Sequence, residues 1–242
     1  MKEYAKDIYI KIAPRVLAGI FMVTMLIGSC GNAFSADKAE AQSIIDKSKG
    51  TLTDLMNDEA FSWLHGYLRT AKGVLIFPQV IKGGFFLGGS GGTGVLMVRD
   101  EATGAWSEPA FYTVGSVTFG LQIGGEAAEV VMVATNKRAI DSLLSSSVKL
   151  GGDVSVAVGP FGGGAKGALT VPEVRADFVS FTKAKGLYAG LNLEGSVLAV
   201  RDALNSAYYG REIMPKDIIV LKEVSNTGAE ELRSSLNKAL AK

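Results

Sequence analysis

Apolar residues recur at helical spacing in residues 37–56, which predicts an amphipathic helix with Asp37 as its cap and a point of interruption at Gly50. A second stripe of apolar residues in residues 61–68 predicts a second helix. Both stripes need a surface to pack against, because an amphipathic helix is stabilised mainly by burying its apolar face.

After Gly73 the period changes to two, and short apolar runs alternate with glycines, which is typical of strands. Residues 99–104 predict a hairpin connection with Gly104 in its turn. Asn136 is predicted to cap a short helix, another short helix is predicted over 201–209, and a final one over 227–240, where Thr227 and Glu230 have capping-box spacing. The predicted strands are residues 74–78, 84–89, 94–98, 110–114, 120–124, 129–135, 153–159, 178–181, 187–193 and 196–200.

Residues 37–242 contain no Pro/Ser-rich linker or charge run that would divide them. The pattern therefore predicts a single α+β domain over 37–242, with helices packed on a mostly antiparallel sheet. Because glycine-rich strands bend easily, we expect the sheet to be curved.

The first residues have the pattern of a targeting segment. A positively charged segment is followed by an apolar run, residues 16–27, that is too short for the roughly 20 residues of a permanent transmembrane helix. This order is that of a secretory signal, and we assign residues 1–29 to a signal peptide.

Two cleavage sites remain open. Ile27-Gly28-Ser29-Cys30 resembles the lipobox of bacterial lipoproteins, in which the Cys is acylated before cleavage. Ala33-Phe34-Ser35 would instead suit ordinary signal peptidase, with cleavage before Ala36. We favour lipidation of Cys30. We also favour a location on the periplasmic side of the outer membrane, because Gly31 occupies the position where lipoproteins that this chain resembles carry an Asp as the signal for retention at the inner membrane. A soluble periplasmic or secreted protein is the alternative.

Composition excludes several classes of protein. The 242 residues are 48% hydrophobic and 20% charged, so the chain can bury a core and is not a disordered segment. Cleavage before Cys30 removes four positive and two negative residues, leaving 21 positive and 22 negative ones. This balance argues against nucleic acid as a partner. One Cys and one His, Cys30 and His65, argue against a disulfide framework and a multi-His metal site.

No motif indicates a reaction or a cofactor. Gly89, Gly91 and Gly94 match the spacing of a dinucleotide-binding turn, but the residues that follow are predicted to form a strand rather than the required helix. The second glycine cluster, residues 162–167, lacks the Gly-Lys-Ser/Thr ending of a P-loop. His65 has no predicted nucleophile or metal ligand beside it. We therefore predict a protein that is not an enzyme, without catalytic residues, metal or cofactor.

Basic residues close to strand or helix ends, often beside glycine, predict sites for phosphate or lipid headgroups. Lys183 and Lys185, which flank Ala184 just before Gly186, are the preferred pair. The other candidates for lipid binding are Lys72, Lys82, Lys149, Lys166, Arg201 and Arg211. Two roles remain open for Phe85 and Phe86: they line an apolar groove together with Gly83, Gly84, Gly88 and Gly89, or, as we favour, they pack in the core.

The order of several segments resembles the SYLF domain, a family found beside Src-homology-3 domains in yeast and animal proteins and alone in bacterial envelope proteins. The resemblance spans roughly residues 44–220. The segments that carry it are AKGVLIFP (71–78), GVLMVRD (94–100), TGAWSEPAFY (103–112), NKRAIDSLLSS (136–146), KLGGDVSVAVGP (149–160), KGLYAGLNLEGSVL (185–198) and AYYGR (207–211).

The resemblance implies a lipid-binding module, with phosphatidylinositol phosphates as ligands of eukaryotic members and actin as a ligand of some fungal ones. An exported bacterial chain would not meet actin, so the expected partners here are anionic lipids of the envelope. The prediction is thus a lipid-anchored, lipid-binding envelope protein. The alternatives are an envelope protein that binds a protein partner and a hydrolase of envelope lipids.

Overall fold

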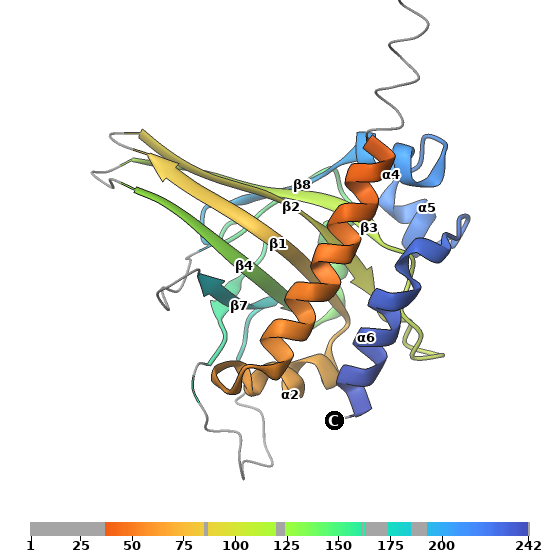
Figure 1. The fold of residues 1–242 in the computed structure, drawn as a ribbon, viewed down its shortest axis with the longest axis horizontal. Helices are drawn as coiled ribbons and strands as arrows, with labels where there is room; N and C mark the ends of the chain where they lie inside the picture. Colours follow the sequence, from red (N-terminus) through yellow and green to blue (C-terminus); the bar gives the residue numbers. More distant parts are fainter. Residues whose placement is uncertain are drawn as a thin grey trace, which may run out of the picture.

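Eight strands form one sheet in the order β5-β8-β3-β2-β1-β4-β7-β6 (Figure 1). Neighbouring strands are antiparallel except β6 and β7, which are parallel. The structure is a computed structural model that describes residues 37–84, 87–119, 124–160, 162, 174–184 and 193–241. The strands are β1 (Gly73–Gly84), β2 (Leu87–Val98), β3 (Ala110–Phe119), β4 (Gly124–Ala134), β5 (Ser147–Lys149), β6 (Val156–Val158), β7 (Phe178–Ala184) and β8 (Val197–Val200).

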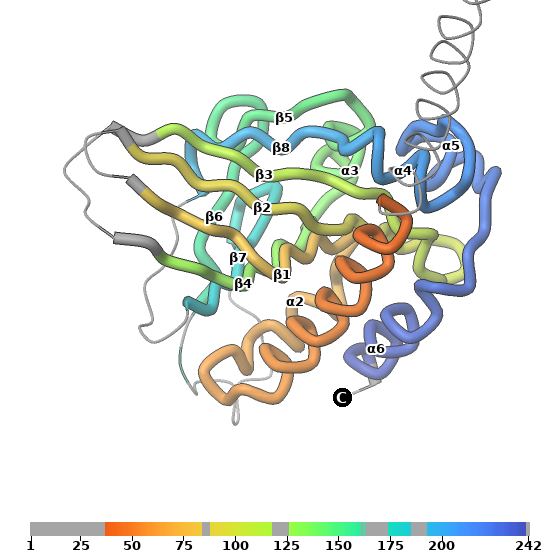
Figure 2. The backbone as a smooth tube through the Cα atoms, turned by 45° about the horizontal axis from the view of Figure 1, so that its top comes forward, coloured from red at the N-terminus to blue at the C-terminus, as the bar shows by residue number. Residues whose placement is uncertain are grey.

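Helices cover both faces of this curled sheet (Figure 2). An N-terminal helix occupies residues 37–57 without interruption at Gly50. No helix in the described part of the chain is both long and apolar enough to cross a membrane. The remaining helices are η1 (Glu59–Phe61), α2 (Trp63–Thr70), α3 (Lys137–Leu143), α4 (Asp202–Tyr209), α5 (Pro215–Ile219), η2 (Thr227–Ala229) and α6 (Glu230–Ala241).

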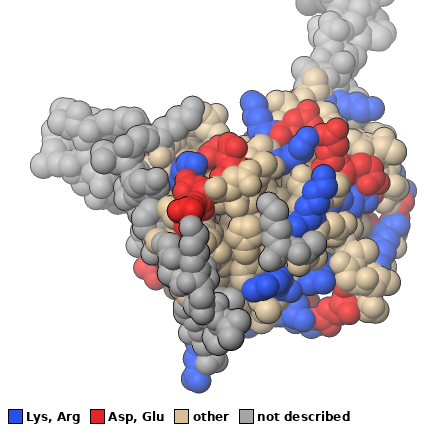
Figure 3. All heavy atoms as spheres, turned by 60° about the horizontal axis from the view of Figure 1, so that its bottom comes forward, with Lys and Arg blue, Asp and Glu red and all other residues tan. Residues whose placement is uncertain are grey.

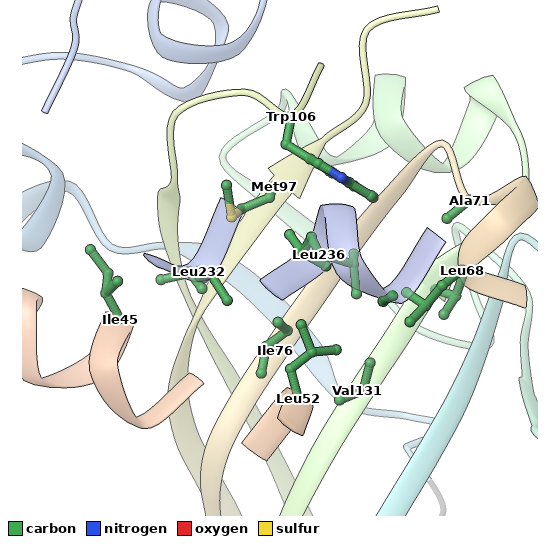
Figure 4. Packing of buried hydrophobic residues seen from close by; sticks show 14 of the residues in the cluster. Ile45, Leu52, Leu68, Ala71, Ile76, Met97, Trp106, Val131, Leu232 and Leu236 are labelled. Carbon is green, nitrogen blue, oxygen red and sulfur yellow. The ribbon is translucent and has the colours of Figure 1, made fainter. Parts of the chain in front are cut away.

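The sheet separates two hydrophobic clusters. The N-terminal helix, α2 and α6 pack on one face, where Ile76, Met97 and Val131 are buried (Figure 4). On the other face α3 and α5 pack over Leu75 and Met132. Successive residues of a strand point to opposite faces, so the central strands are apolar at every position where both faces are covered. This arrangement confirms the predicted α+β class with its mostly antiparallel sheet.

Gly94 is required by a bulge in β1. The register of β1 against β2 shifts between Ile76 and Val80. A Cβ on Gly94 would lie 2.2 Å from the carbonyl oxygen of Ile76, whereas real Cβ atoms essentially never come closer than 3.0 Å to another heavy atom. The spacing that resembles a dinucleotide-binding turn therefore belongs to the interior of β2 and serves close packing against the bulge.

Asp177 ties three elements together. It is 5% exposed, and its carboxylate accepts hydrogen bonds from the backbone and hydroxyl of Ser155 at 2.9 Å each and from Asn136 Nδ2 at 3.1 Å. Burial alone would raise the pKa of Asp177, but these hydrogen bonds hold it below its usual value. Asn136 in turn caps α3, as predicted, by accepting from the backbone N–H of Ala139.

Some predicted elements differ from the observed ones. Residues 84–89 are not a strand of their own, because β1 ends and β2 begins within them; Phe85 and Phe86 lie outside the described residues. The predicted strands at 120–124 and 187–193 also lie largely outside the described residues. The final helix is capped by Asn226, whose side chain accepts from the backbone of Gly228 at 2.9 Å, rather than by Thr227.

The sequence pattern missed α5, which is a single turn. After it, Lys222 has a φ of 54°, the one positive φ of a non-glycine residue in the described part of the chain. The backbone N–H of Glu223 closes the turn by donating to the carbonyl of Asp217 at 3.0 Å. Glycine usually occupies this position because it reaches positive φ without strain.

Candidate functional site

The preferred lysine pair is only half described. Lys183 lies near the end of β7, with its Nζ 3.0 Å from Asp58 Oδ2. The hydrogen bond from Lys183, together with one from the backbone of Ala60, holds the pKa of Asp58 below its usual value, and the same bond raises the pKa of Lys183. Lys185 and Lys166 lie outside the described residues. The charge of Lys183 is thus compensated within the fold, and its role in lipid binding stays a prediction.

Two further candidates are also ion-paired. Lys72, just before β1, has its Nζ 2.9 Å from Glu101 Oε1. Arg211, which follows α4, pairs with Glu223. All four side chains are exposed, so each pair contributes little to stability, but a headgroup would have to compete with a carboxylate for either cation.

The last three candidates lie apart from one another. Arg201, at the start of α4, has its guanidinium 3.8 Å from Glu40 and 3.5 Å from the hydroxyl of Thr93. Lys82 lies near the end of β1, and Lys149 lies in β5 at the edge of the sheet. On the face shown in Figure 3, basic and acidic side chains are interspersed. The structure therefore does not bring the described candidates into one basic patch.

His65 has a structural contact. Its Nε2 lies 2.9 Å from the carbonyl oxygen of Met56, near the end of the N-terminal helix. This contact links α2 to the preceding helix and indicates a packing role for the ring.

A different feature stands out where β1 to β4 extend past the helices, toward the left of Figure 1. The sequence has no charged residue between Lys82 and Arg99, and none between Glu108 and Glu126. We call this region the sheet tip and define it as residues 81–84 of β1, 87–91 of β2, 115–119 of β3 and 124–127 of β4.

One face of the sheet tip is apolar. Ile81 pairs with Gly91 on β2 and with Ala127 on β4, and paired residues share a face. Val117 lies on the same face, two residues beyond Gly115, which pairs with Gly91. Ile81 is 56% exposed and Val117 is 68% exposed. This is the face that the N-terminal helix covers further along, as the hydrogen bond from Thr51 to Glu129 shows.

The opposite face of the tip is polar. Lys82 pairs with Ser90 on β2 and with Glu126 on β4, and Ser90 pairs with Ser116 on β3. The two serine hydroxyls are hydrogen-bonded to each other at 2.7 Å. The sheet tip is therefore amphipathic, with a smooth apolar face of glycines and aliphatic side chains backed by a polar row.

The groove expected at Phe85 and Phe86 would lie in this region, but the structure does not test that expectation. Phe85 and Phe86 connect β1 to β2 in the sequence but lie outside the described residues, as does Cys30. The glycines expected to line that groove lie in the tip, but the exposed Ile81 and Val117 were not among the residues predicted from the sequence. The signal that could have found it is the pair of charge-free intervals, which only becomes meaningful once the strands are known to lie side by side.

The comparisons with known proteins identify the family. Residues 115–239 match the Ysc84 family, described as "Las17-binding protein actin regulator". The chain belongs to this family. The resemblance to the SYLF domain, the domain of Ysc84-type proteins, is thereby confirmed.

Curated relatives show the same relationship over a longer stretch. The chain is 35% identical over 176 residues to SH3 domain-containing protein PJ696.02 of Schizosaccharomyces pombe, covering 72% of this chain and 40% of the relative. It is 33% identical over 168 residues to SH3 domain-containing YSC84-like protein 1 of Homo sapiens, covering 69% and 48%. Protein YSC84 of Saccharomyces cerevisiae is 34% identical over 155 residues, covering 63% and 32%. The aligned part is thus less than half of each relative. No solved structure matches significantly.

Proposed function

We propose that this chain is a non-enzymatic, lipid-binding protein of the bacterial cell envelope, anchored through acylated Cys30 on the periplasmic side of the outer membrane. Its folded domain contacts the bilayer with the sheet tip. The observation that carries the proposal is the exposure of Ile81 and Val117 at a sheet end without charges beyond Lys82 and Glu126. Exposed apolar surface backed by a polar face is typical of elements that lie in the membrane interface.

The dimensions of the tip suit a shallow contact. Gly84, at the end of β1, lies two residues beyond Lys82. These two residues span about 7 Å of strand, which is close to the depth at which interfacial segments are buried in a bilayer. Strand pairing limits the depth further. β8 pairs with β3 only through Gly115, and β7 pairs with β4 only from Ala128, so the outer edges of the tip have no neighbour among the described strands. Such edges need water or headgroups as hydrogen-bond partners.

An anchor at Cys30 is compatible with this contact. Arg201 contacts both Glu40, in the N-terminal helix, and Thr93, in β2. The N-terminal helix therefore starts about midway along β2. From Thr93 to the first residue of β2 the strand runs about 20 Å. The seven steps of chain from Cys30 to the described helix reach up to about 24 Å. The anchor and the tip can therefore touch one membrane plane.

The names of the relatives describe an actin regulator and proteins with an SH3 domain. An exported chain would not meet actin filaments, so the lipid ligand proposed here is the phospholipid of the envelope. Headgroup binding by the lysines predicted above, Lys183 and Lys185 first, is a further component of the proposal and depends on charge.

Flotation with vesicles tests the proposal. The chain from Gly31 to Lys242 keeps every described element and lacks Cys30, so an acyl anchor cannot cause binding. We expect it to float with phosphatidylcholine vesicles and to stay bound at high salt, because apolar contacts are not screened. Flotation only with anionic vesicles, lost as salt rises, would assign the binding to the lysines instead. No flotation with either vesicle would refute lipid binding by the domain.

The open edges of β3 and β4 favour one alternative, a protein partner that adds a strand to the sheet. This alternative predicts a defined complex in detergent-free solution and no dependence on vesicles. Size-exclusion chromatography with light scattering of the same chain distinguishes it from lipid binding.

A further inference from the structure

A row of polar side chains crosses the sheet tip on the face opposite its exposed aliphatic side chains. Lys82 of β1 lies between Glu126 of β4 and Ser90 of β2. Ser90 in turn lies opposite Ser116 of β3. Residues that are paired in this way share a face of the sheet and lie at one level along the strands. We call these four residues the polar row.

The polar row is accessible and carries both signs of charge. All four side chains are partly exposed. Lys82 and Glu126 are the two charged residues among those that define the sheet tip, and the strands that hold them are about 4.8 Å apart. The hydroxyls of Ser90 and Ser116 share one hydrogen bond of 2.7 Å, which uses one of their two hydrogens. The row therefore presents a cation, an anion and a hydroxyl donor to a molecule that reaches it.

The membrane contact proposed above brings the polar row to the level of the lipid headgroups. β1 continues two residues beyond Lys82, which is about 7 Å of strand and matches a shallow apolar contact. The charges of the row then stay in the polar region that borders the hydrocarbon core. Their neighbours in a bilayer are consequently the phosphates and the groups attached to them.

One cation beside one anion selects against a headgroup that carries only negative charge. The phosphate of phosphatidylglycerol is attracted by Lys82 and repelled by Glu126. A zwitterionic headgroup instead has a phosphate and an ammonium group joined by an ethylene bridge. Aligned against Lys82 and Glu126, it places each charge beside one of opposite sign. Any attraction between the two side chains is thereby replaced, and a solvent-accessible pair contributes little to begin with.

We propose, on the basis of that membrane contact, that the polar row recognises the phosphoethanolamine headgroup of phosphatidylethanolamine. The phosphate accepts from Lys82 Nζ and from the serine hydroxyl whose hydrogen the pair leaves free, and the primary ammonium donates to the carboxylate of Glu126. The quaternary ammonium of phosphatidylcholine has no N–H to donate to Glu126. Lys82 is among the candidates predicted from the sequence, whereas the role of Glu126 becomes visible only when β4 lies beside β1.

Headgroups with increasing methylation test the recognition. Vesicles contain the same mole fraction of phosphatidylethanolamine, its N-methyl form, its N,N-dimethyl form or phosphatidylglycerol in phosphatidylcholine, or phosphatidylcholine alone, all with the same acyl chains. Flotation of the chain from Gly31 to Lys242 gives a partition coefficient for each. We expect partitioning to fall as N–H groups are lost, by about fivefold from phosphatidylethanolamine to phosphatidylcholine, the upper range for one solvent-exposed ion pair.

Glu126→Gln separates recognition from a general effect of the vesicle. The variant keeps a polar side chain of the same size but loses the charge-assisted hydrogen bond. It should partition equally into phosphatidylethanolamine and phosphatidylcholine, and more strongly than the parent chain into phosphatidylglycerol, because the repulsion of the phosphate is gone. Methylation changes lipid packing for both proteins alike, so the ratio of parent to variant isolates the contact.

Two further variants complete the comparison. Lys82→Gln should lower binding to phosphatidylethanolamine and to phosphatidylglycerol, since both present a phosphate. Glu212→Gln makes the same change of charge as Glu126→Gln at an exposed position between α4 and α5. It should behave like the parent chain. A preference that Glu212→Gln also loses would depend on net charge and would overturn the proposed recognition.

The outcomes separate the headgroup from the membrane contact itself. Equal partitioning of the parent chain into every methylated form, or a preference for phosphatidylethanolamine that persists in Glu126→Gln, would overturn the recognition and leave the contact of the tip intact. If the parent chain floats with none of the vesicles, the tip is not a membrane contact and the recognition that rests on it is wrong as well.

Discussion

Replacing Ile81 and Val117 by alanine removes the two aliphatic side chains that the sheet tip exposes most. Ile81 is 56% exposed and Val117 is 68% exposed, so neither is needed for the core. Both pair across the sheet with glycine, and alanine is compatible with the extended backbone there. The double variant should therefore fold like the parent chain, and its loss of membrane binding can be attributed to the tip.

The size of the effect follows from the exposed surface. Burying one methylene is worth about 0.8 kcal/mol, and the change to alanine removes three carbons from Ile81 and two from Val117. Scaled by the exposed fractions, this gives about 1.3 kcal/mol for Ile81 and about 1.1 kcal/mol for Val117. The two together correspond to about a 50-fold lower partition coefficient.

The assay is a lipid titration with phosphatidylcholine vesicles, followed by flotation, on the chain from Gly31 to Lys242. Val158→Ala is the matched control, because Val158 is 60% exposed on β6, away from the tip. We expect the control to partition like the parent chain. If the double variant also partitions like the parent, or if the control loses as much binding, the tip is not the membrane contact.

Three further predictions concern stability. Asp177→Ala leaves buried donors unpaired and should lower the free energy of unfolding by about 3 kcal/mol. Because the pKa of Asp177 is lowered in the folded state, this contribution is present above the unfolded pKa and is lost as the pH falls below about 4. Chemical denaturation of both proteins at pH 7 and pH 3 measures the difference. Gly94→Ala should prevent stable folding or cost more than about 3 kcal/mol, whereas Gly83→Ala, which would touch nothing within 4 Å, should be near neutral by thermal unfolding. Lys222→Gly should be about 1 kcal/mol more stable than Lys222→Ala, because both lose the ion pair with Asp100 but only glycine relieves the positive φ; equal melting temperatures would contradict this.

Local pattern was enough for most elements of the fold. Helical spacing located the N-terminal helix and α2, and the cap at Asn136 located the start of α3. Alternation located the half of each long strand that lies between the helices, and the glycines indicated a curved sheet, but the halves of β1 to β4 that form the tip were not recognised as parts of the same strands. These signals succeed because they depend on neighbours within one turn or one hairpin.

Features that depend on distant residues could not be predicted. The order of the strands, the parallel pairing of β6 with β7 and the bulge opposite Gly94 are set by contacts between segments far apart in the sequence. The same holds for the basic residues. In the sequence Lys183 looks like a free cation, because its partner Asp58 is more than a hundred residues away. Short helices such as α5 show too few residues for a periodic signal.

The proposed contacts orient the domain as well as attach it. Ile81 and Val117 contribute about 2.4 kcal/mol, which gives the domain without its anchor a weak and reversible partitioning of the kind that the lipid titration measures. An acyl chain at Cys30 changes this, because a tethered site meets the bilayer at an effective concentration in the millimolar range. A weak apolar contact is then sufficient to select one orientation. With the tip in the interface up to the row of Lys82 and Ser90, the eight steps of β2 from Ser90 to Val98 span about 26 Å, and the connection at Trp106 lies at their far end. The connection between β2 and β3 would consequently lie in the aqueous phase, on the side of the domain away from the membrane.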